Sequence, residues 1–281
     1  MHFFYALFAT LLMLAAAAPA AAAGTLDRIK SKGQITLGYG TEARPFSFQD
    51  TGGKPLGYGV ELCAKVADLL KAKPVFVQVT RAERLSAVAE GRIDLLCDAV
   101  VPTPASRQQV SYTIPVFATG VSAVVRTNGT ARLQEILSGR PPSTRQAHTF
   151  SFVTGTRVEQ AVVERLHKQQ LDISVLPVKD YQAGLDALLV ERTDALFGDR
   201  VLLLDLVKRG PRSDLSVLDR YFTHETLAFA LARGDDDFRL AVDQALSRLF
   251  RAEEFRGLYA KWFGEPTDET LSLFRMGALP E

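Results

Sequence analysis

Hydrophobic positions along the first half of the chain change repeatedly between two spacings. Short apolar runs typical of buried strands occupy residues 34–40, 75–80 and 93–100. The segments between them, 59–72 and 81–91, carry apolar residues at helical spacing instead. In 59–72 the apolar face consists of Val60, Cys63, Val66, Ala67 and Leu70. This strand–helix–strand–helix–strand order predicts an α/β unit with a parallel sheet and helices on both faces.

The same alternation returns in the second half. Strand-like runs at 149–153, 173–178 and 194–199 are separated by helical patterns at 156–169 and 181–192. A further helical pattern ends at Gly210 with Pro211 behind it, which is a usual stop signal. This order predicts a second α/β unit.

Two extended runs, at 121–129 and 225–234, flank that second unit. They predict two lobes joined by two crossing strands, with the final helical patterns at 236–250 and 252–264 returning to the first lobe. We expect lobe 1 to comprise 24–123 and 225–281, and lobe 2 to comprise 124–224. Ligands of open α/β sheets bind outside the carboxyl ends of the strands, so the expected site lies between the lobes.

Residues 1–23 differ from the rest of the chain. An apolar run from Phe3 to Ala18 leads into small residues, with Ala-x-Ala cleavage choices between Ala20 and Ala23. This pattern predicts a cleaved signal peptide, although Lys and Arg are missing near Met1. The alternative is a membrane anchor. No later segment reaches the roughly 18 apolar residues that a membrane-spanning helix needs.

Composition and charge narrow the function. The chain has 281 residues, is 23% charged and carries a formal net charge of +1, which gives no support for nucleic-acid binding. The histidines His148, His167 and His224 show no metal-ligand spacing, and no phosphate-loop, dinucleotide or nucleophile motif is present. We expect no metal, no cofactor and no enzymatic activity. Cys63 and Cys97 are either two buried thiols or a disulfide, which export would permit; we favour the disulfide.

Six stretches carry a family resemblance, and they occur in order over nearly the whole chain after residue 23. They are "LDRIKSKGQITLGYGTEARPFSFQD", "GKPLGYGVELCAKVADLL", "RLSAVAEGRIDLLCDAV", "SYTIPVFATG", "GLDALLVERTDALFGDR" and "FRGLYAKWFG". In these the chain resembles the periplasmic solute-binding proteins (family 3) of polar amino-acid ABC transporters, nearest to glutamate/aspartate binders. The resemblance implies a type II two-lobed fold with doubly wound lobes and two hinge strands. It also implies a periplasmic monomer that closes on an amino acid and delivers it to the permease subunits of an ABC transporter.

The resemblance also suggests how the solute is held. An arginine of lobe 1 takes the α-carboxylate, and an aspartate of lobe 2 takes the α-ammonium. Asp199, which follows a strand and opens a helix, matches that aspartate; the alternative is a plain helix N-cap. Thr156 and Arg157 enter a helix after a glycine turn, either as an anion-binding terminus or only as the turn.

Two lobe 1 residues have similar alternatives. Phe46, after the first strand, is expected as an apolar wall of the cleft, but an aromatic residue there is often core. Arg84 aligns with an arginine that faces the ligand side chain in binders of acidic amino acids; the alternative is a solvated helix charge.

The segment "VVPTPASRQQVSYTIP" (100–115) departs from the family pattern. Relatives have approximately Thr-Pro-Glu-Arg, with the arginine six residues before an aromatic. Here that place, counted from Thr103 or from Tyr112, falls on Ser106, and Arg107 stands one position late. Pro102 lacks the N–H that relatives offer to the carboxylate, and Val100 and Val101 make the wall less polar. We expect Thr103, Ser106 and Arg107 as candidate ligand contacts. The protein therefore either repositions its carboxylate grip, with Arg107 or Ser106 facing the cleft, or binds something other than a standard α-amino acid.

Three functions follow from this reading. The leading one is a transport receptor that binds an amino acid without turnover. The alternatives are a carrier of another solute or a partner of a sensor, and a lyase built on the same fold.

Overall fold

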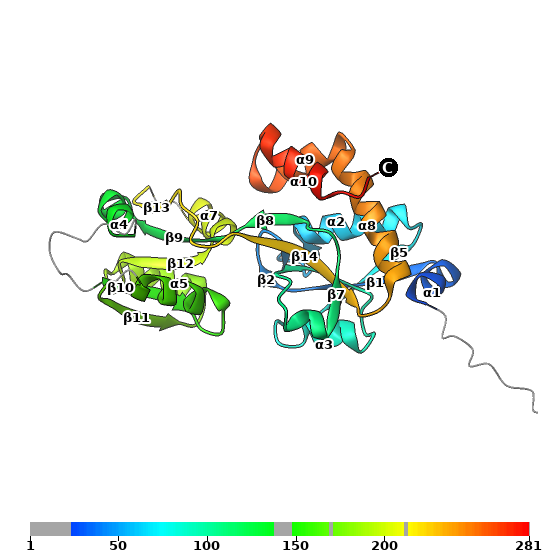
Figure 1. Ribbon diagram of the computed structural model, residues 1–281, viewed down its shortest axis with the longest axis horizontal. Helices are drawn as coiled ribbons and strands as arrows, with labels where there is room; N and C mark the ends of the chain where they lie inside the picture. Colours follow the sequence, from blue (N-terminus) through cyan, green and yellow to red (C-terminus); the bar gives the residue numbers. More distant parts are fainter. Residues whose placement is uncertain (1–23, 138–147, 169–170, 211–212, 281) are drawn as a thin grey trace, which may run out of the picture.

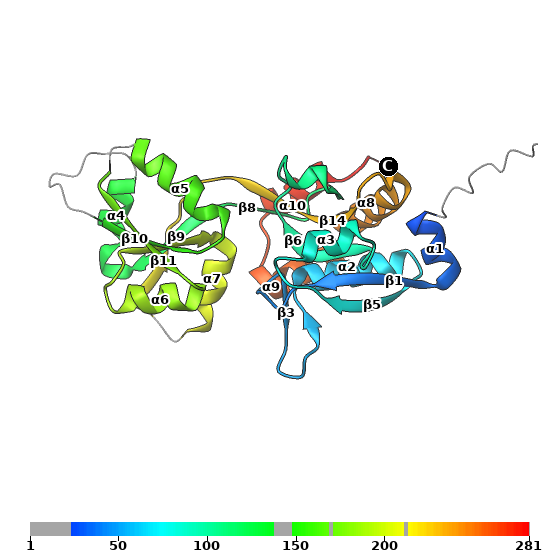
Figure 2. The ribbon, with the colours of Figure 1, turned by 90° about the horizontal axis from the view of Figure 1, so that it is seen from below.

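The computed structural model describes residues 24–137, 148–168, 171–210 and 213–280. The expected signal peptide at 1–23 lies outside the described residues. The chain forms two lobes that lie side by side (Figures 1 and 2), and its C-terminus lies on lobe 1. The two-lobed α/β architecture predicted from the sequence is confirmed.

Lobe 1 is built on a mixed sheet with strand order β5-β1-β6-β14-β7, to which β8 adds along β14. The strands are β1 (Gln34–Tyr39), β5 (Lys73–Gln78), β6 (Leu95–Val100), β7 (Val110–Tyr112), β8 (Phe117–Thr119) and β14 (Glu225–Ala232). A small second sheet contains β2 (Glu42–Ala43), β3 (Ser47–Gln49) and β4 (Pro55–Leu56). The helices are α1 (Thr25–Lys32), α2 (Tyr58–Leu69), α3 (Arg84–Ala89), α8 (Asp236–Arg251), α9 (Glu254–Phe263) and α10 (Asp268–Gly277), with a 3-10 turn η1 (Ser106–Gln108).

Lobe 2 repeats this arrangement with strand order β11-β10-β12-β9-β13. Its strands are β9 (Val121–Arg126), β10 (His148–Val153), β11 (Ile173–Val178), β12 (Ala195–Asp199) and β13 (Leu215–Val217). Its helices are α4 (Thr130–Leu137), α5 (Arg157–Lys168), α6 (Tyr181–Leu189) and α7 (Arg200–Arg209), with a 3-10 turn η2 (Thr127–Gly129). In each lobe three parallel strands come from the alternating pattern, and the next strand, β14 or β9, joins them antiparallel. The two runs expected as connections are thus also sheet strands.

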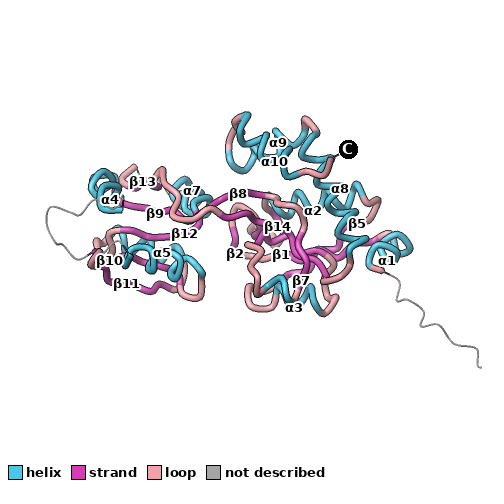
Figure 3. Tube along the Cα trace, in the orientation of Figure 1, coloured by secondary structure: helices cyan, strands magenta, loops and turns pink. Residues whose placement is uncertain are grey.

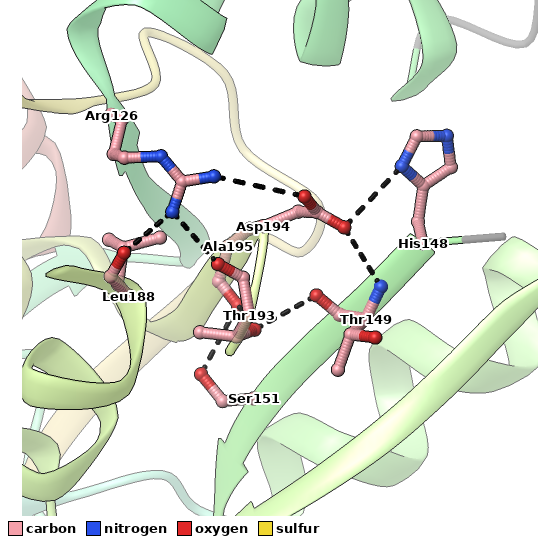
Figure 4. A network of polar contacts seen from close by, with 8 residues as sticks. All are labelled: Arg126, His148, Thr149, Ser151, Leu188, Thr193, Asp194 and Ala195. Carbon is pink, nitrogen blue, oxygen red and sulfur yellow. Dashed lines mark hydrogen bonds and ion pairs between the residues drawn. The ribbon is translucent and has the colours of Figure 1, made fainter. Parts of the chain in front are cut away.

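The two lobes share a polar anchor at the amino ends of their strands. In lobe 1, Asp94 accepts a bond from the backbone N–H of Thr36 at 2.8 Å and pairs with Arg28. In lobe 2, Asp194 accepts from the N–H of Thr149 at 2.9 Å and lies 3.9 Å from Arg126 (Figure 4). Both aspartates stand just before the third parallel strand and fix its register. Because this end of each sheet lies away from the other lobe, the network in Figure 4 supports the fold and does not form the ligand site.

Helix α2 is held to the lobe 1 sheet by a disulfide and by hydrophobic packing. Cys63 on α2 and Cys97 on β6 form a disulfide with a Cα–Cα distance of 6.0 Å, and both side chains are fully buried. The predicted apolar face of α2 packs on the sheet, with Val66 and Ala67 fully buried. The two secondary-structure elements are therefore joined both by packing and by a covalent bond.

Strands and loops, without helices, make both crossings between the lobes (Figure 3). The crossings touch at Gly120 and Thr223, where the N–H of Val121 donates to Thr223 Oγ1 at 3.1 Å. A Cβ atom on Gly120 would lie 1.9 Å from the Thr223 carbonyl oxygen, so only glycine lets the two backbones approach this closely. The lobe 2 sheet begins at Val121, slightly before the boundary expected at 123/124.

Candidate functional site

The hinge ribbon, defined here as the paired strands β8 and β14, presents two faces. Thr119 lies opposite Glu225, and Ala118 lies opposite Thr226. Directly opposed residues in an antiparallel pair point to the same side, and successive residues point to opposite sides. Thr119 and Glu225 therefore define one face, which we call the cleft face, and Ala118 and Thr226 define the other.

Asp199 lies against the cleft face. It ends β12 and caps α7, where its Oδ1 accepts from the N–H of Val201 at 2.9 Å. The Thr119 hydroxyl donates to the same oxygen at 3.0 Å, so a hinge strand directly contacts this carboxylate. The N-cap expected as the alternative is present. Ligand contact by Asp199 stays a prediction.

The environment of Asp199 disfavours its charge. Burial raises the pKa of Asp199 to about 6, and the hydrogen bonds from Thr119, Val201 and Leu202 only partly oppose this. The neighbouring carboxylate of Glu225 raises the pKa further. A bound cation would relieve both effects, which makes this position suited to an ammonium group.

Tyr181 lies beside Asp199 and interacts electrostatically with Arg81 of lobe 1. Burial raises the pKa of Tyr181 to about 12, with Asp199 adding to the shift and Arg81 opposing it. Arg81 belongs to lobe 1 and Tyr181 to lobe 2, so the two lobes approach each other here. Tyr181 also explains Gly198, because a Cβ there would lie 2.5 Å from the tyrosine ring. Within the described residues Arg81 forms no ion pair and is exposed.

Arg84 already has a partner. Its Nη1 lies 2.5 Å from Oδ2 of Asp98, a β6 residue that is 5% exposed. The pair places Arg84 near the carboxyl end of the lobe 1 sheet, but the charge of Arg84 is compensated within the protein. A solvated helix charge, the alternative expected from sequence, is not what the structure shows.

Thr156 and Arg157 lie at the start of α5. The Thr156 hydroxyl donates to the carbonyl oxygen of Val153 at 2.8 Å, as in a simple turn. Arg157 Nη2 lies 3.9 Å from Glu225 Oε1, and its side chain is 62% exposed. Arg157 therefore reaches the cleft face of the hinge ribbon, while Thr156 has a local partner.

Phe46 lies in the hydrophobic core of lobe 1, which was the alternative to its expected place on the cleft wall. It is 3% exposed, and its ring packs edge-on against Tyr58 and Phe117 at centroid distances of 6.2 and 5.1 Å. A contact between Phe46 and the solute stays a prediction without support from this geometry.

The segment after β6 that departs from the family pattern (100–115) forms hydrogen bonds within itself. Thr103 and Ser106 exchange reciprocal bonds, with Thr103 N to Ser106 Oγ and Ser106 N to Thr103 Oγ1 both 3.0 Å. Arg107, in η1, is exposed and lies over the ring of Tyr112, 5.3 Å from its centroid. These three side chains have local partners in this conformation, and their ligand roles stay predictions.

Sequence reasoning missed four residues of this site: Thr119, Glu225, Tyr181 and Arg81. Glu225 stands in a run interpreted only as a connecting strand, Thr119 lies just before the other such run, and Arg81 and Tyr181 each start a predicted helix. A polar residue in each hinge run was the available signal.

Among the described residues, no cluster of three or more His, Cys, Asp or Glu side chains is arranged to hold a metal ion. In the same part of the chain, no helix combines the length and the apolar character needed to cross a bilayer.

The fold and site define a two-lobed binding protein with its polar side chains gathered between the lobes. The sequence profile of the bacterial extracellular solute-binding proteins, family 3, matches residues 35–265, and the chain belongs to this family. It is 26% identical to the L-glutamate/L-aspartate-binding protein of Pseudomonas aeruginosa over 252 residues, covering 86% of this chain and 81% of that one. It is equally similar to the L-cystine-binding protein TcyJ of Escherichia coli, with 26% identity over 243 residues and 86% of both chains covered.

A solved structure agrees in fold. An ancestral amino acid-binding protein, described as a precursor of cyclohexadienyl dehydratase, superposes with a TM-score of 0.70. It shares 25% identity and covers 86% of this chain and 100% of its own. The expected family and the type II fold are both confirmed, and the chain is an extracytoplasmic solute-binding protein.

Proposed function

We propose that this protein captures a free amino acid between its lobes and delivers it, chemically unchanged, to an ABC permease. Family membership and the named ligands of its relatives support this class of solute. We further propose that the protein acts as a monomer outside the cytoplasmic membrane, after cleavage of the segment 1–23.

The observation that carries the proposal is the buried carboxylate of Asp199 bound to the hinge. An amino acid ammonium placed on Asp199 replaces the water that burial has removed and stabilises the ionised carboxylate. Because Thr119 of the hinge holds the same carboxylate, a ligand on Asp199 also contacts the moving part of the protein. Glu225 adds a second negative charge at this end.

For the α-carboxylate we propose Arg81 as the cation of lobe 1. Arg84 is neutralised by Asp98, and Arg107 is engaged with Tyr112, whereas Arg81 is unpaired in the described structure and close enough to Tyr181 to act across the cleft. This is the repositioned carboxylate grip that the altered segment 100–115 leads one to expect. Arg157, at the α5 N-terminus, offers a second cation from lobe 2.

The test is a titration of the mature protein with each common amino acid by thermal shift, followed by calorimetry on the strongest. We expect saturable binding of one or a few amino acids, with at least a tenfold loss in both Asp199→Asn and Arg81→Gln. Exposed Lys168→Gln, at the C-terminal end of α5 and so at the opposite end of lobe 2, is the matched control and should bind normally. If no amino acid shifts the protein and none is found by mass spectrometry after denaturation, the proposal is wrong.

The same sample distinguishes a lyase. Proton NMR of the incubated amino acid should show unchanged solute after overnight incubation with the protein. Accumulation of an elimination product would instead establish the enzymatic alternative.

A further inference from the structure

A cavity lies between the lobes beside the hinge ribbon. It has a volume of about 740 Å³ and is bordered by Phe117, Ala118 and Thr226 of the ribbon. Lobe 2 contributes one side of α7 together with Tyr221, and lobe 1 contributes Arg44, α9 and α10. None of the residues proposed above for the amino acid lines this cavity. Its size is within the range of small-molecule sites.

The floor of the cavity is aromatic. Phe117 stacks on Tyr259 with a centroid distance of 6.1 Å and an interplanar angle of 14°, and it packs against Phe263 at 4.6 Å. At the rim, Leu204 and Leu273 are 41% and 55% exposed. An apolar body would therefore gain burial against both the floor and the rim.

The charged groups of the cavity are mostly cations. Five line it, and they are Arg44, Arg200, Lys208, Arg209 and Lys261. Three carboxylates oppose them: Asp205 inside the lining, and Asp219 and Glu61 beside it. Five positive and three negative charges leave a net charge of +2, because Arg44 and Arg209 share Asp205 and Lys208 forms no ion pair among the described residues. A ligand with a negative group would therefore be favoured.

Three residues that line the cavity also carry side-chain N–H groups without a hydrogen bond: Arg44 Nε, Arg200 Nε and Trp262 Nε1. Arg44 Nε lies 3.7 Å from Asp205 Oδ2. All three nitrogens are buried from solvent, so a ligand in the cavity reaches them only after the side chains turn toward it. Each of the three can only donate, so such a rearrangement would favour oxygen acceptors over another amine.

We propose that this cavity binds a small organic anion, a carboxylate or sulfonate on an aromatic or hydrocarbon body. The anionic group meets the excess cations, and the body lies on the partly exposed Tyr259 and Phe263 rings. Because both lobes line the cavity, such a ligand holds them at a fixed separation and acts on the same hinge as the amino acid. The site is separate from the cleft, so its test does not depend on the identity of the amino acid.

The experiment uses 8-anilinonaphthalene-1-sulfonate, whose fluorescence rises in apolar sites, titrated into the folded mature protein. We expect saturable binding at one site, displaced by 3-phenylpropionate but at least tenfold less well by 3-phenylpropanol or 3-phenylpropylamine. The variant Lys208→Gln/Leu273→Ser removes an unpaired cation and a rim side chain and should weaken the dye at least tenfold. The matched control Lys179→Gln/Leu240→Ser changes an exposed lysine and an exposed leucine away from the cavity and should bind like the parent protein.

Circular dichroism tests whether each variant is folded. If the double variant is not folded, the single variants Lys208→Gln and Leu273→Ser replace it, and each should lower the dye affinity about threefold. Equal displacement by the acid and the alcohol would overturn the proposal. So would a dye affinity that is unchanged in the cavity variant, or lowered equally in the control.

Discussion

Asp199 serves two purposes that oppose each other energetically. As the cap of α7 it satisfies a backbone N–H, which stabilises the helix. As a buried carboxylate beside Glu225 it destabilises the ligand-free protein whenever it is ionised, because its pKa is raised to about 6. The proposed ammonium site would retain such a charge in spite of its cost.

Replacing Asp199 by Asn should therefore stabilise the ligand-free protein at pH 7.5. The folded pKa is about 6 against an ordinary value of 3.8, so the folded state binds the proton more tightly than the unfolded state. The stabilisation from this group is complete below pH 4 and is lost as the pH rises through 6. Asn keeps the cap without the charge, and we expect a gain of about 1–3 kcal/mol at pH 7.5 that disappears near pH 4. Urea unfolding at both pH values measures it.

The contrasting variant is Asp98→Asn, which leaves Arg84 without its carboxylate. It should destabilise the protein at pH 7.5 by about 1–3 kcal/mol, because a partly buried cation loses its partner. Equal effects of the two substitutions would contradict the assignment of Asp199 as a strained charge and Asp98 as a paired one.

Amino acid binding should depend on pH through the same carboxylate. The ammonium group pairs with ionised Asp199, and protonation below pH 6 competes with it, whereas the charges of the amino acid backbone stay constant between pH 5 and 8. Affinity at pH 5 should be about tenfold weaker than at pH 8 by linkage. Calorimetry at the two pH values measures this, and an unchanged affinity would exclude Asp199 from the ammonium site.

At the scale of elements, the alternation of strand and helix patterns predicted the three parallel strands of each lobe, because buried parallel strands and amphipathic helices leave distinct hydrophobic spacings. Asp199 was recognised because it ends such a strand. Thr119 and Glu225 were not, because they are distant in sequence and only the pairing of β8 with β14 brings them together. The partner of Asp98 could not be predicted, because a single acidic residue in an apolar run does not indicate which cation pairs with it.

The contact between the two crossings rests on Gly120. In Gly120→Ala the new Cβ would meet the Thr223 carbonyl oxygen, a backbone atom that cannot move alone. We expect a loss of about 1–3 kcal/mol in the free energy of unfolding, together with weaker amino acid binding, because the crossings must separate. Gly129→Ala, which has no atom within 4 Å of the new Cβ, is the control and should change stability by less than about 0.5 kcal/mol. Equal stability of the two variants would exclude this tight contact.

The disulfide joins α2 to β6 across 34 residues of sequence. Cross-linking a loop of that length lowers the entropy of the unfolded chain, and its removal should cost about 4 kcal/mol. Urea unfolding of the Cys63→Ser/Cys97→Ser variant, compared with the parent protein with and without reductant, measures the effect. A parent protein that is insensitive to reductant and as stable as the variant would mean that the bond contributes nothing.

At the scale of the whole molecule, the hinge ribbon separates two inter-lobe spaces with different chemistry. Thr119 and Glu225 of the ribbon lie beside Asp199, and the cationic, aromatic cavity opens beside the same ribbon. Rotation about a ribbon between two spaces narrows one as it widens the other, so contacts that join the lobes across the cavity oppose closure of the cleft. The two faces are therefore coupled through one equilibrium between open and closed forms.

The ion pair between Arg44 of lobe 1 and Asp205 of lobe 2, 3.7 Å apart on the cavity face, gives a direct test of that coupling. Asp205→Asn removes the pair and should shift the ligand-free protein toward the closed form. Since both side chains are partly exposed, the pair is worth at most about 1 kcal/mol, which limits the gain in amino acid affinity to about fivefold. Asp205 also pairs with Arg209 on its own helix at 2.8 Å, so Arg209→Gln is the matched control, because it breaks the intrahelical pair and leaves Arg44 in place. Small-angle scattering of the ligand-free proteins should show a smaller radius of gyration for Asp205→Asn than for the parent protein, and no change for Arg209→Gln. If Asp205→Asn has the same radius as the parent protein, or binds the amino acid more weakly than Arg209→Gln does, the two faces of the hinge are not coupled.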